Sequence, residues 1–271
     1  MTAAGAFGLA SIAMMSVSAA ALAGGSIKDE PVEEKRRCSH SFNIGVTSDY
    51  MFRGISQSVQ SINDEIAPAV QGGADLTCGI FYAGVWASTI DFGLTPDNAT
   101  TEVDFYAGIK PTLGKATFDL GVIYYWYPGS TNLLNEIDYV ELKAGVSMPL
   151  MDKLTAGATV FYSPDYTFET GNVVTLEGTL AYELPAWGKV TPSISALVGY
   201  QRGSDNTYFT NALATDDDYL YWNAGLSLAI DKITLDFRYW DTDIGSDAAG
   251  ICGNADLCDA RFVASAKITL P

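Results

Sequence analysis

The stretch TFDLGVIYYW, residues 117–126, decides the fold. Its side chains alternate between an apolar face and a mixed face, the period of two that is typical of a β-strand. The apolar face carries Phe118, Leu120, Val122, Tyr124 and Trp126. A tilted strand needs about 9–11 residues to cross a bilayer, and this stretch has that length. The pattern therefore predicts a strand that can span a membrane with one face toward lipid.

Segments of the same kind recur along the chain from Ser41 onward. The predicted strands cover 41–53, 66–77, 79–90, 101–111, 115–127, 136–149, 153–162, 172–184, 189–201, 219–230, 232–241 and 260–270. Their number is even, as it is in bacterial single-chain outer-membrane barrels. The sequence therefore predicts an all-β protein, a transmembrane antiparallel up-and-down β-barrel of about twelve strands, in one domain over 41–271.

The connections between these strands are of two kinds that alternate. Short links are predicted at 78–79, 113–114, 151–152, 186–188 and 231–232. Longer and mostly acidic links are predicted at 54–65, 91–100, 128–135, 163–171, 202–218 and 242–259. A soluble sandwich has no reason to alternate in this way, whereas outer-membrane barrels have short periplasmic turns and longer external loops. We therefore expect the short links in the periplasm and the long ones outside.

The N-terminal region has the features of an export signal. Residues 1–23 are apolar or small and end in Ala21-Leu22-Ala23, a pattern that signal peptidase cleaves. We interpret them as a signal peptide, with a transmembrane helix as the alternative. Residues 24–40 are charged and lack periodicity, which predicts a periplasmic N-terminal tail. No later segment approaches about 18 consecutive apolar residues, so a membrane crossing must use strands, and we expect the bacterial outer membrane as the location.

Charged residues inside the predicted strands fall on the face opposite the apolar series. They are Asp49, Asp75, Glu102, Asp104, Lys110, Asp119, Glu141, Lys143, Glu177, Asp236, Arg238, Arg261 and Lys267. A Lys or Arg that faced lipid near the bilayer midplane would cost about 2–4 kcal/mol, so this set is predicted to line the pore. The solvated face of a soluble sheet would show the same alternation, which leaves the loop pattern as the stronger argument for a barrel.

Many predicted strands also place a glycine on this inward face. These glycines are Gly45, Gly73, Gly84, Gly108, Gly121, Gly145, Gly157, Gly199 and Gly225. Without a side chain, glycine relieves crowding inside a narrow barrel and lets strands bend for closure. Bulky residues share the face and could fill the lumen. They are Tyr82, Trp86, Tyr106, Tyr125, Phe161 and Trp240.

Aromatic residues gather at the predicted strand ends, where membrane interfaces favour them. The outer belt is predicted to contain Tyr50, Phe52, Tyr124, Trp126, Tyr162, Tyr200, Trp222 and Tyr239. The periplasmic belt is predicted to contain Phe42, Phe81, Tyr182 and Trp187. Aromatic residues favour strands in general, so it is their clustering at the strand ends that indicates the two belts.

The four cysteines form an even set in a chain that we expect to be exported, which favours disulfides over metal binding or redox catalysis. Cys38 precedes the first predicted strand and Cys78 lies at the turn after the second. Cys252 and Cys258 share the last long link. The strand order therefore predicts disulfides between Cys38 and Cys78 and between Cys252 and Cys258.

Charge and motifs argue against several classes of function. The chain has 15 Lys and Arg against 32 Asp and Glu, and nucleic acid is not an expected partner because phosphate binding needs basic clusters. The single histidine, His40, precedes the first predicted strand, and no hydrolase, nucleotide-binding or zinc motif is present. We therefore expect no enzymatic activity, cofactor or metal. The acidic run 216–218 could hold Ca²⁺, although a solvated loop is the favoured interpretation.

Five stretches carry a resemblance to a known family. They are TSDYMFRGISQS from Thr47, PAVQGGADL from Pro68, GIFYAGVWAST from Gly79, EVDFYAGIKP from Glu102 and FDLGVIYYWYPG from Phe118. They resemble the TorF family of proteobacterial outer-membrane porins over roughly 42–270. The resemblance implies a β-barrel porin without catalytic residues. It carries over no binding site. The expected partners of the chain are outer-membrane lipid, small hydrophilic solutes and the barrel-assembly machinery.

The resulting functional expectation is a porin-like channel for passive diffusion of small hydrophilic solutes. A mild cation preference is expected, because the predicted pore-lining set has eight acidic and five basic members and the external loops are acidic. The alternative is a closed barrel that acts as a structural or surface-interaction protein. Twelve strands lie between eight, whose interior side chains can fill, and sixteen, which leave an aqueous channel.

Overall fold

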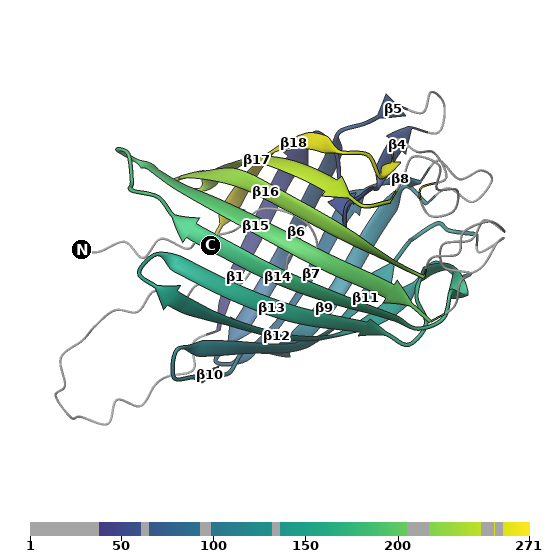
Figure 1. Ribbon diagram of the computed structural model, residues 1–271, viewed down its shortest axis with the longest axis horizontal. Helices are drawn as coiled ribbons and strands as arrows, with labels where there is room; N and C mark the ends of the chain where they lie inside the picture. The colour runs from purple at the N-terminus through teal and green to yellow at the C-terminus, as the bar shows by residue number, and fades with distance from the viewer. Residues whose placement is uncertain are drawn as a thin grey trace.

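The computed structural model describes residues 38–60, 65–92, 99–131, 136–204, 217–244, 252 and 257–271. Twelve long strands form one closed antiparallel sheet (Figure 1). They are β1 (Ser39–Thr47), β6 (Ala69–Cys78), β7 (Phe81–Thr89), β9 (Thr101–Ile109), β11 (Ala116–Trp126), β12 (Tyr139–Met151), β13 (Leu154–Ser163), β14 (Val173–Glu183), β15 (Val190–Gly203), β16 (Asp218–Ile230), β17 (Ile233–Thr242) and β18 (Arg261–Leu270). Each pairs with its neighbours along the chain, and β1 pairs with β18 to close the ring. The predicted all-β up-and-down barrel is confirmed.

The remaining elements are short. They are β2 (Met51–Phe52), β3 (Ile55–Ser56), β4 (Ser58–Gln60), β5 (Glu65–Ile66), β8 (Asp91–Phe92), β10 (Thr112–Leu113) and the 3₁₀ turn η1 (Thr167–Glu169). Within the described ranges, no helix has both the length and the apolar character needed to cross a membrane. The predicted signal peptide, 1–23, and the predicted tail as far as residue 37 lie outside the described residues.

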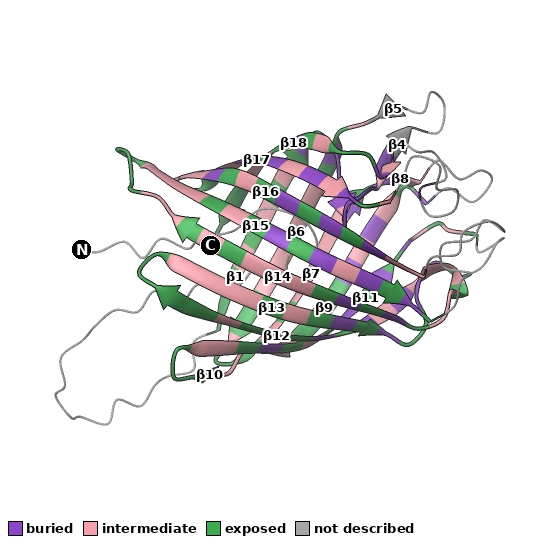
Figure 2. Cartoon of the chain, in the orientation of Figure 1, coloured by how far each residue is buried: buried purple, intermediate pink, exposed green. Residues whose placement is uncertain are grey.

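The strands present an apolar surface outward and a polar surface inward. Exposed and buried positions alternate along them (Figure 2). In β11, Phe118 and Leu120 are exposed, whereas Asp119, Ile123 and Tyr125 are buried. Large apolar side chains are exposed around the whole ring, an arrangement that is unfavourable in water and suits the hydrocarbon of a bilayer.

The two ends of the barrel differ in their connections. The short turns and the C-terminal end of β18 lie at one end, and β4, β5 and β8 lie at the other (Figure 1). Gly79 and Gly114, both at short turns, have φ of +63°, a conformation that glycine adopts without a steric penalty and that tight hairpins require. We call these the short-turn end and the long-loop end.

Both predicted disulfides are present. Cys38 and Cys78 have Cα atoms 4.3 Å apart and join the start of β1 to the end of β6 at the short-turn end. Cys252 and Cys258 have Cα atoms 5.7 Å apart and lie at the long-loop end, in the connection between β17 and β18. Each disulfide therefore joins residues at the same end of the barrel, as the order of the strands predicts.

The first predicted strand, 41–53, is wrong in its second half. β1 ends at Thr47, whose pairing partner Ala69 directly follows Pro68 in the chain. Proline has no N–H to donate, so the ladder stops there and the chain turns into the barrel. Tyr50 is consequently only 1% exposed and Phe52 packs against the interior cluster. Neither residue belongs to the outer aromatic belt.

The other predicted belt residues lie on the outer surface. Tyr124, Trp126, Tyr162 and Trp222 are exposed toward the long-loop end, and Tyr200 and Tyr239 are half-exposed there. Phe42, Phe81, Tyr182 and Trp187 are exposed toward the short-turn end.

Candidate functional site in the barrel lumen

The thirteen residues predicted to line a pore all lie on the inward face. Asp49, Glu102, Asp104, Asp119, Glu141, Lys143, Asp236 and Arg238 are buried, and Asp75, Lys110, Glu177, Arg261 and Lys267 are half-buried. Asp49 follows β1 instead of lying within it, as a strand over 41–53 would have placed it. His40 lies at the start of β1 and is exposed, with its ring against Phe42.

The half of the lumen toward the short turns holds two ion-pair clusters on separate walls. Lys143 Nζ lies 2.7 Å from Asp119 Oδ2, and Tyr82 donates to the other oxygen of that carboxylate at 2.7 Å. Lys110 Nζ lies 3.7 Å from the same Oδ2 atom. These groups come from β7, β11 and β12 and from the residue after β9, so the cluster joins adjacent strands of one wall.

The second cluster surrounds Arg238 on β17. Its guanidinium donates to both oxygens of Asp236 at 3.0 Å, to Asn223 at 2.7 Å and to Ser195 at 3.0 Å. Ser227 also donates to Asp236. Arg238 and Asp236 are each 1% exposed, so their charges compensate one another where little water reaches them.

The half of the lumen toward the long loops contains a segment of the chain itself. We call residues 49–58 the lumen segment. It contains β2 and β3, which pair with each other and with no strand of the ring. Met51 is 3% exposed and Ile55 is 5% exposed, so the segment is as buried as the core of a soluble protein.

Arg53 is the charged centre of the lumen segment. Its Nη1 and Nη2 atoms each lie 2.8 Å from one carboxylate oxygen of Glu141, a bidentate pair, and Nη1 also donates to Gln201 at 3.2 Å. The guanidinium carbon lies 4.8 Å from the ring centre of Phe52 and 5.0 Å from that of Phe161. Ion pairing, hydrogen bonding and cation–π contact therefore act together to hold this one buried charge.

The segment is also attached to other parts of the wall. Asp49 accepts from Arg261 at 2.8 Å and from Ser56 at 2.7 Å. The Tyr50 hydroxyl donates to Glu102 at 2.6 Å. Burial raises the pKa of the Tyr50 phenol well above its usual value, and the charges of Glu102 and Asp104 raise it further, so the phenol remains a donor.

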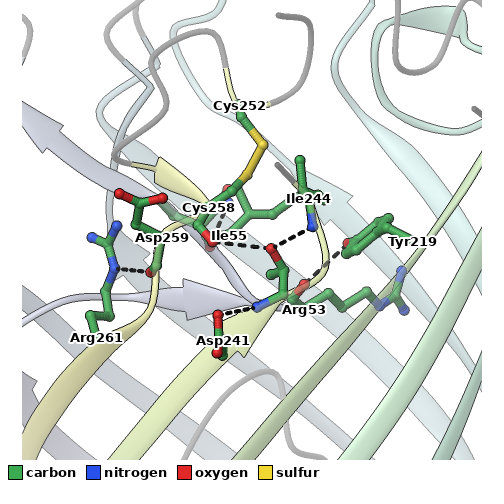
Figure 3. Close-up of a disulfide and its surroundings, with 11 residues drawn as sticks. Arg53, Ile55, Tyr219, Asp241, Ile244, Cys252, Cys258, Asp259 and Arg261 are labelled. Carbon is green, nitrogen blue, oxygen red and sulfur yellow. Dashed lines mark hydrogen bonds between the residues drawn. A yellow bond between two sulfur atoms is a disulfide. The ribbon is translucent and has the colours of Figure 1, made fainter. Parts of the chain in front are cut away.

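Gly54 forms the turn of this small hairpin and fits closely against the wall. Its φ is +83°, and a Cβ atom built there would lie 2.5 Å from Thr242 Cγ2 and 2.8 Å from Tyr221 Cβ. Only glycine satisfies both the backbone conformation and the space. The Tyr219 hydroxyl donates to the Arg53 carbonyl oxygen at 3.1 Å (Figure 3).

The Cys252–Cys258 disulfide lies at the same mouth of the barrel. Thr242, which contacts the Gly54 turn, donates to the Cys258 carbonyl oxygen at 3.0 Å. Cys258 and Ile55 belong to the same interior cluster. Cys258 and the lumen segment therefore pack in the same part of the barrel interior.

Sequence reasoning missed Arg53, which was assigned to the end of a strand, and missed the role of Gly54. The available signal was the position of both residues inside TSDYMFRGISQS, the first of the stretches that resemble a known family. An arginine followed by glycine at the end of a predicted strand fits a turn better than a continued ladder.

A protein-family model matches residues 33–270, and its description is "Bacterial protein of unknown function (Gcw_chp)". The chain belongs to the Gcw_chp family. The match covers all twelve strands of the ring and the lumen segment. The expected resemblance to TorF porins is confirmed only as far as the barrel fold, and the family that the match establishes is Gcw_chp. No curated protein sequence matches this Gcw_chp chain.

Solved structures agree with the barrel fold. The chain is similar to the KdgM porin, with a TM-score of 0.52 and 8% identity over 85% of this chain and 99% of that one. It is similar to the NanC porin, with a TM-score of 0.50 and 11% identity over 86% of this chain and 100% of that one. At such low identity the likeness establishes the fold alone. This Gcw_chp protein shares the closed β-barrel fold of these two porins.

Proposed function

We propose that this protein is a channel of the bacterial outer membrane through which small hydrophilic solutes diffuse passively. The observation that carries the proposal is the contrast between the two surfaces of one closed sheet. The outer surface is apolar around the ring, whereas the inner surface carries the thirteen charged residues described above. Charged groups on an inner wall favour water and polar solutes. The proposed partners of such a barrel are the lipid around its apolar outer surface and the machinery that assembles barrels into the membrane.

A mild preference for cations is part of this proposal. The lumen contains eight acidic residues, and Arg53 raises the number of basic residues from five to six, so acidic residues outnumber basic ones by two. Asp75, Glu102 and Glu177 accept hydrogen bonds from tyrosine hydroxyls at 2.5, 2.6 and 2.7 Å. Within the described residues these three carboxylates form no ion pair within 4.0 Å. Their charge favours cations in the lumen.

Planar-bilayer recordings of the full chain under a salt gradient test both statements. We expect discrete conductance steps and a reversal potential displaced in the direction of cation selectivity. A reversal potential of the opposite sign would reject the cation preference. Complete absence of steps from protein that is folded by circular dichroism would reject the open channel.

The second candidate function is a closed barrel with a structural or surface-interaction role. The lumen segment favours it, because Tyr50, Met51 and Arg53 occupy the lumen and are each no more than 3% exposed. This candidate predicts no conductance from folded protein, so the same recordings distinguish the two functions.

A further inference from the structure

The lumen segment reaches opposite sides of the barrel. Arg53 binds Glu141 on β12, and Asp49 binds Arg261 on β18. In the closed order of strands, β12 and β18 are separated by the same number of strands in both directions, so they face each other across the lumen. Four extended residues span about 13–14 Å, and two arginine side chains add to that reach. The segment therefore crosses the diameter of the barrel.

Side chains supply most of the contacts between the segment and the ring. β2 and β3 form a separate two-stranded sheet, with Met51 opposite Ser56 and Phe52 opposite Ile55. The ring holds the hairpin through Glu141, Gln201 and Arg261, and through the Tyr219 hydroxyl on the Arg53 carbonyl. A segment outside the ladder can be displaced without breaking the sheet that closes the barrel.

We propose that the lumen segment is the element that limits passage through this barrel, and that the Arg53–Glu141 ion pair is the contact that keeps it across the lumen. The inference rests on the proposed channel function and assigns the residues that set its conductance and its size limit. The lumen segment belongs to the first long connection, between β1 and β6, and lies on the path that a solute would take.

The ion pair suits this role because of where it lies. Arg53 is 3% exposed and Glu141 is 1% exposed, and the Tyr125 hydroxyl also donates to Glu141 at 3.0 Å. Removing one partner of a buried pair leaves the other charge buried without compensation, which is strongly unfavourable. The remaining charged residue, Arg53 or Glu141, can recover water only if the segment moves away from the wall. We therefore expect the segment to leave the lumen.

The test uses the full chain in planar bilayers with Arg53→Met, Glu141→Gln and the double variant. A fourth variant replaces residues 51–56 with a short Gly-Ser linker, which removes the hairpin itself. Arg202→Met is the matched control, because Arg202 pairs with Asp217 at the long-loop rim, is largely exposed and lies outside the lumen segment. Circular dichroism in detergent checks that each variant is folded.

We expect severalfold larger conductance, or a severalfold higher open probability, in the linker variant and in both single variants. The double variant should lie between the wild type and the single variants, because it removes the ion pair without leaving an uncompensated buried charge. Neutral polymers of graded size should enter these variants at larger sizes than they enter the wild type. Arg202→Met should behave as the wild type does.

The outcomes separate the inference from the proposed function. Wild-type conductance that stays unchanged in all the lumen variants would overturn the inference and leave the channel function standing. A silent wild type with a conducting linker variant would support the inference and reject an open channel in favour of a closed barrel. Silence of every folded variant would reject both.

Discussion

At the scale of single residues, several of the inward glycines provide the space into which tyrosine rings pack. A Cβ atom built on Gly84 would lie 2.5 Å from the ring of Tyr106, and one on Gly199 would lie 2.0 Å from the ring of Tyr221. Tyr221 in turn donates to Glu177 at 2.7 Å. The glycines were predicted to relieve crowding, and the structure shows which side chains use the space. Each tyrosine thereby reaches a carboxylate on another strand.

We predict that Gly199→Ala destabilises the protein by about 1–3 kcal/mol, because the new methyl group must displace Tyr221 from its packing and from Glu177. Gly178→Ala is the matched control on the paired strand, since its Cβ would meet only Val198 at 3.7 Å. The control should change stability by no more than about 0.5 kcal/mol. Urea unfolding from lipid vesicles measures both, and equal losses would contradict the packing argument.

At the scale of elements, the end of β1 determines what the lumen contains. The β1–β6 ladder stops at Thr47, whose partner Ala69 is preceded by Pro68, and the residues after Thr47 fold inward instead of continuing the strand. Cys38, which directly precedes the other end of β1, forms a disulfide with Cys78. The disulfide therefore holds the start of β1 against the β6–β7 turn and leaves its far end to lead into the lumen segment.

The two disulfides should contribute unequally to stability. Chain entropy favours the bond that closes the longer loop, and the sequence separations are 40 for Cys38–Cys78 and 6 for Cys252–Cys258. We expect replacing the first pair by serines to cost about 4 kcal/mol and the second about 2 kcal/mol in free energy of unfolding. Unfolding titrations of the two double variants measure this order. A larger loss for the second pair would mean that its contacts at the barrel mouth outweigh loop closure.

At the scale of the whole molecule, the closed sheet separates two environments. Leu120 lies in the middle of β11 and is exposed on the outer surface, beside Asp119, which is buried in the lumen. One step along the strand thus moves a side chain from the apolar outer surface to the polar lumen. The same alternation in all twelve strands makes the apolar exterior continuous.

We predict that Leu120→Arg destabilises the barrel in lipid vesicles by about 2–4 kcal/mol, because it places a charge near the middle of the membrane-facing surface. Leu113→Arg is the matched control, since Leu113 is 75% exposed at a short turn, near the end of the barrel. There the same substitution should cost about 0–1 kcal/mol. Equal costs at the two positions would argue against a bilayer around the ring.

Local properties of the sequence determined the barrel, its strand number, the alternation of its faces and the pairing of its cysteines. Each depends on the period, length and order of segments, which are local properties of the chain. Strand order also identified the inward charges. It could not identify their partners, because Lys143 meets Asp119 only when β11 and β12 pair in one particular register.

Only the tertiary structure decided where residues 49–58 lie. Asp49, Met51 and Arg53 alternate with Tyr50 and Phe52 as they would in a strand, so periodicity continued the first strand through them. Whether they extend the ladder or enter the lumen depends on the partner strand β6, which begins only after Pro68. It depends also on Glu141, which is 88 residues from Arg53 and reaches it only because the ring closes. Contacts across a closed lumen join residues that no local pattern relates.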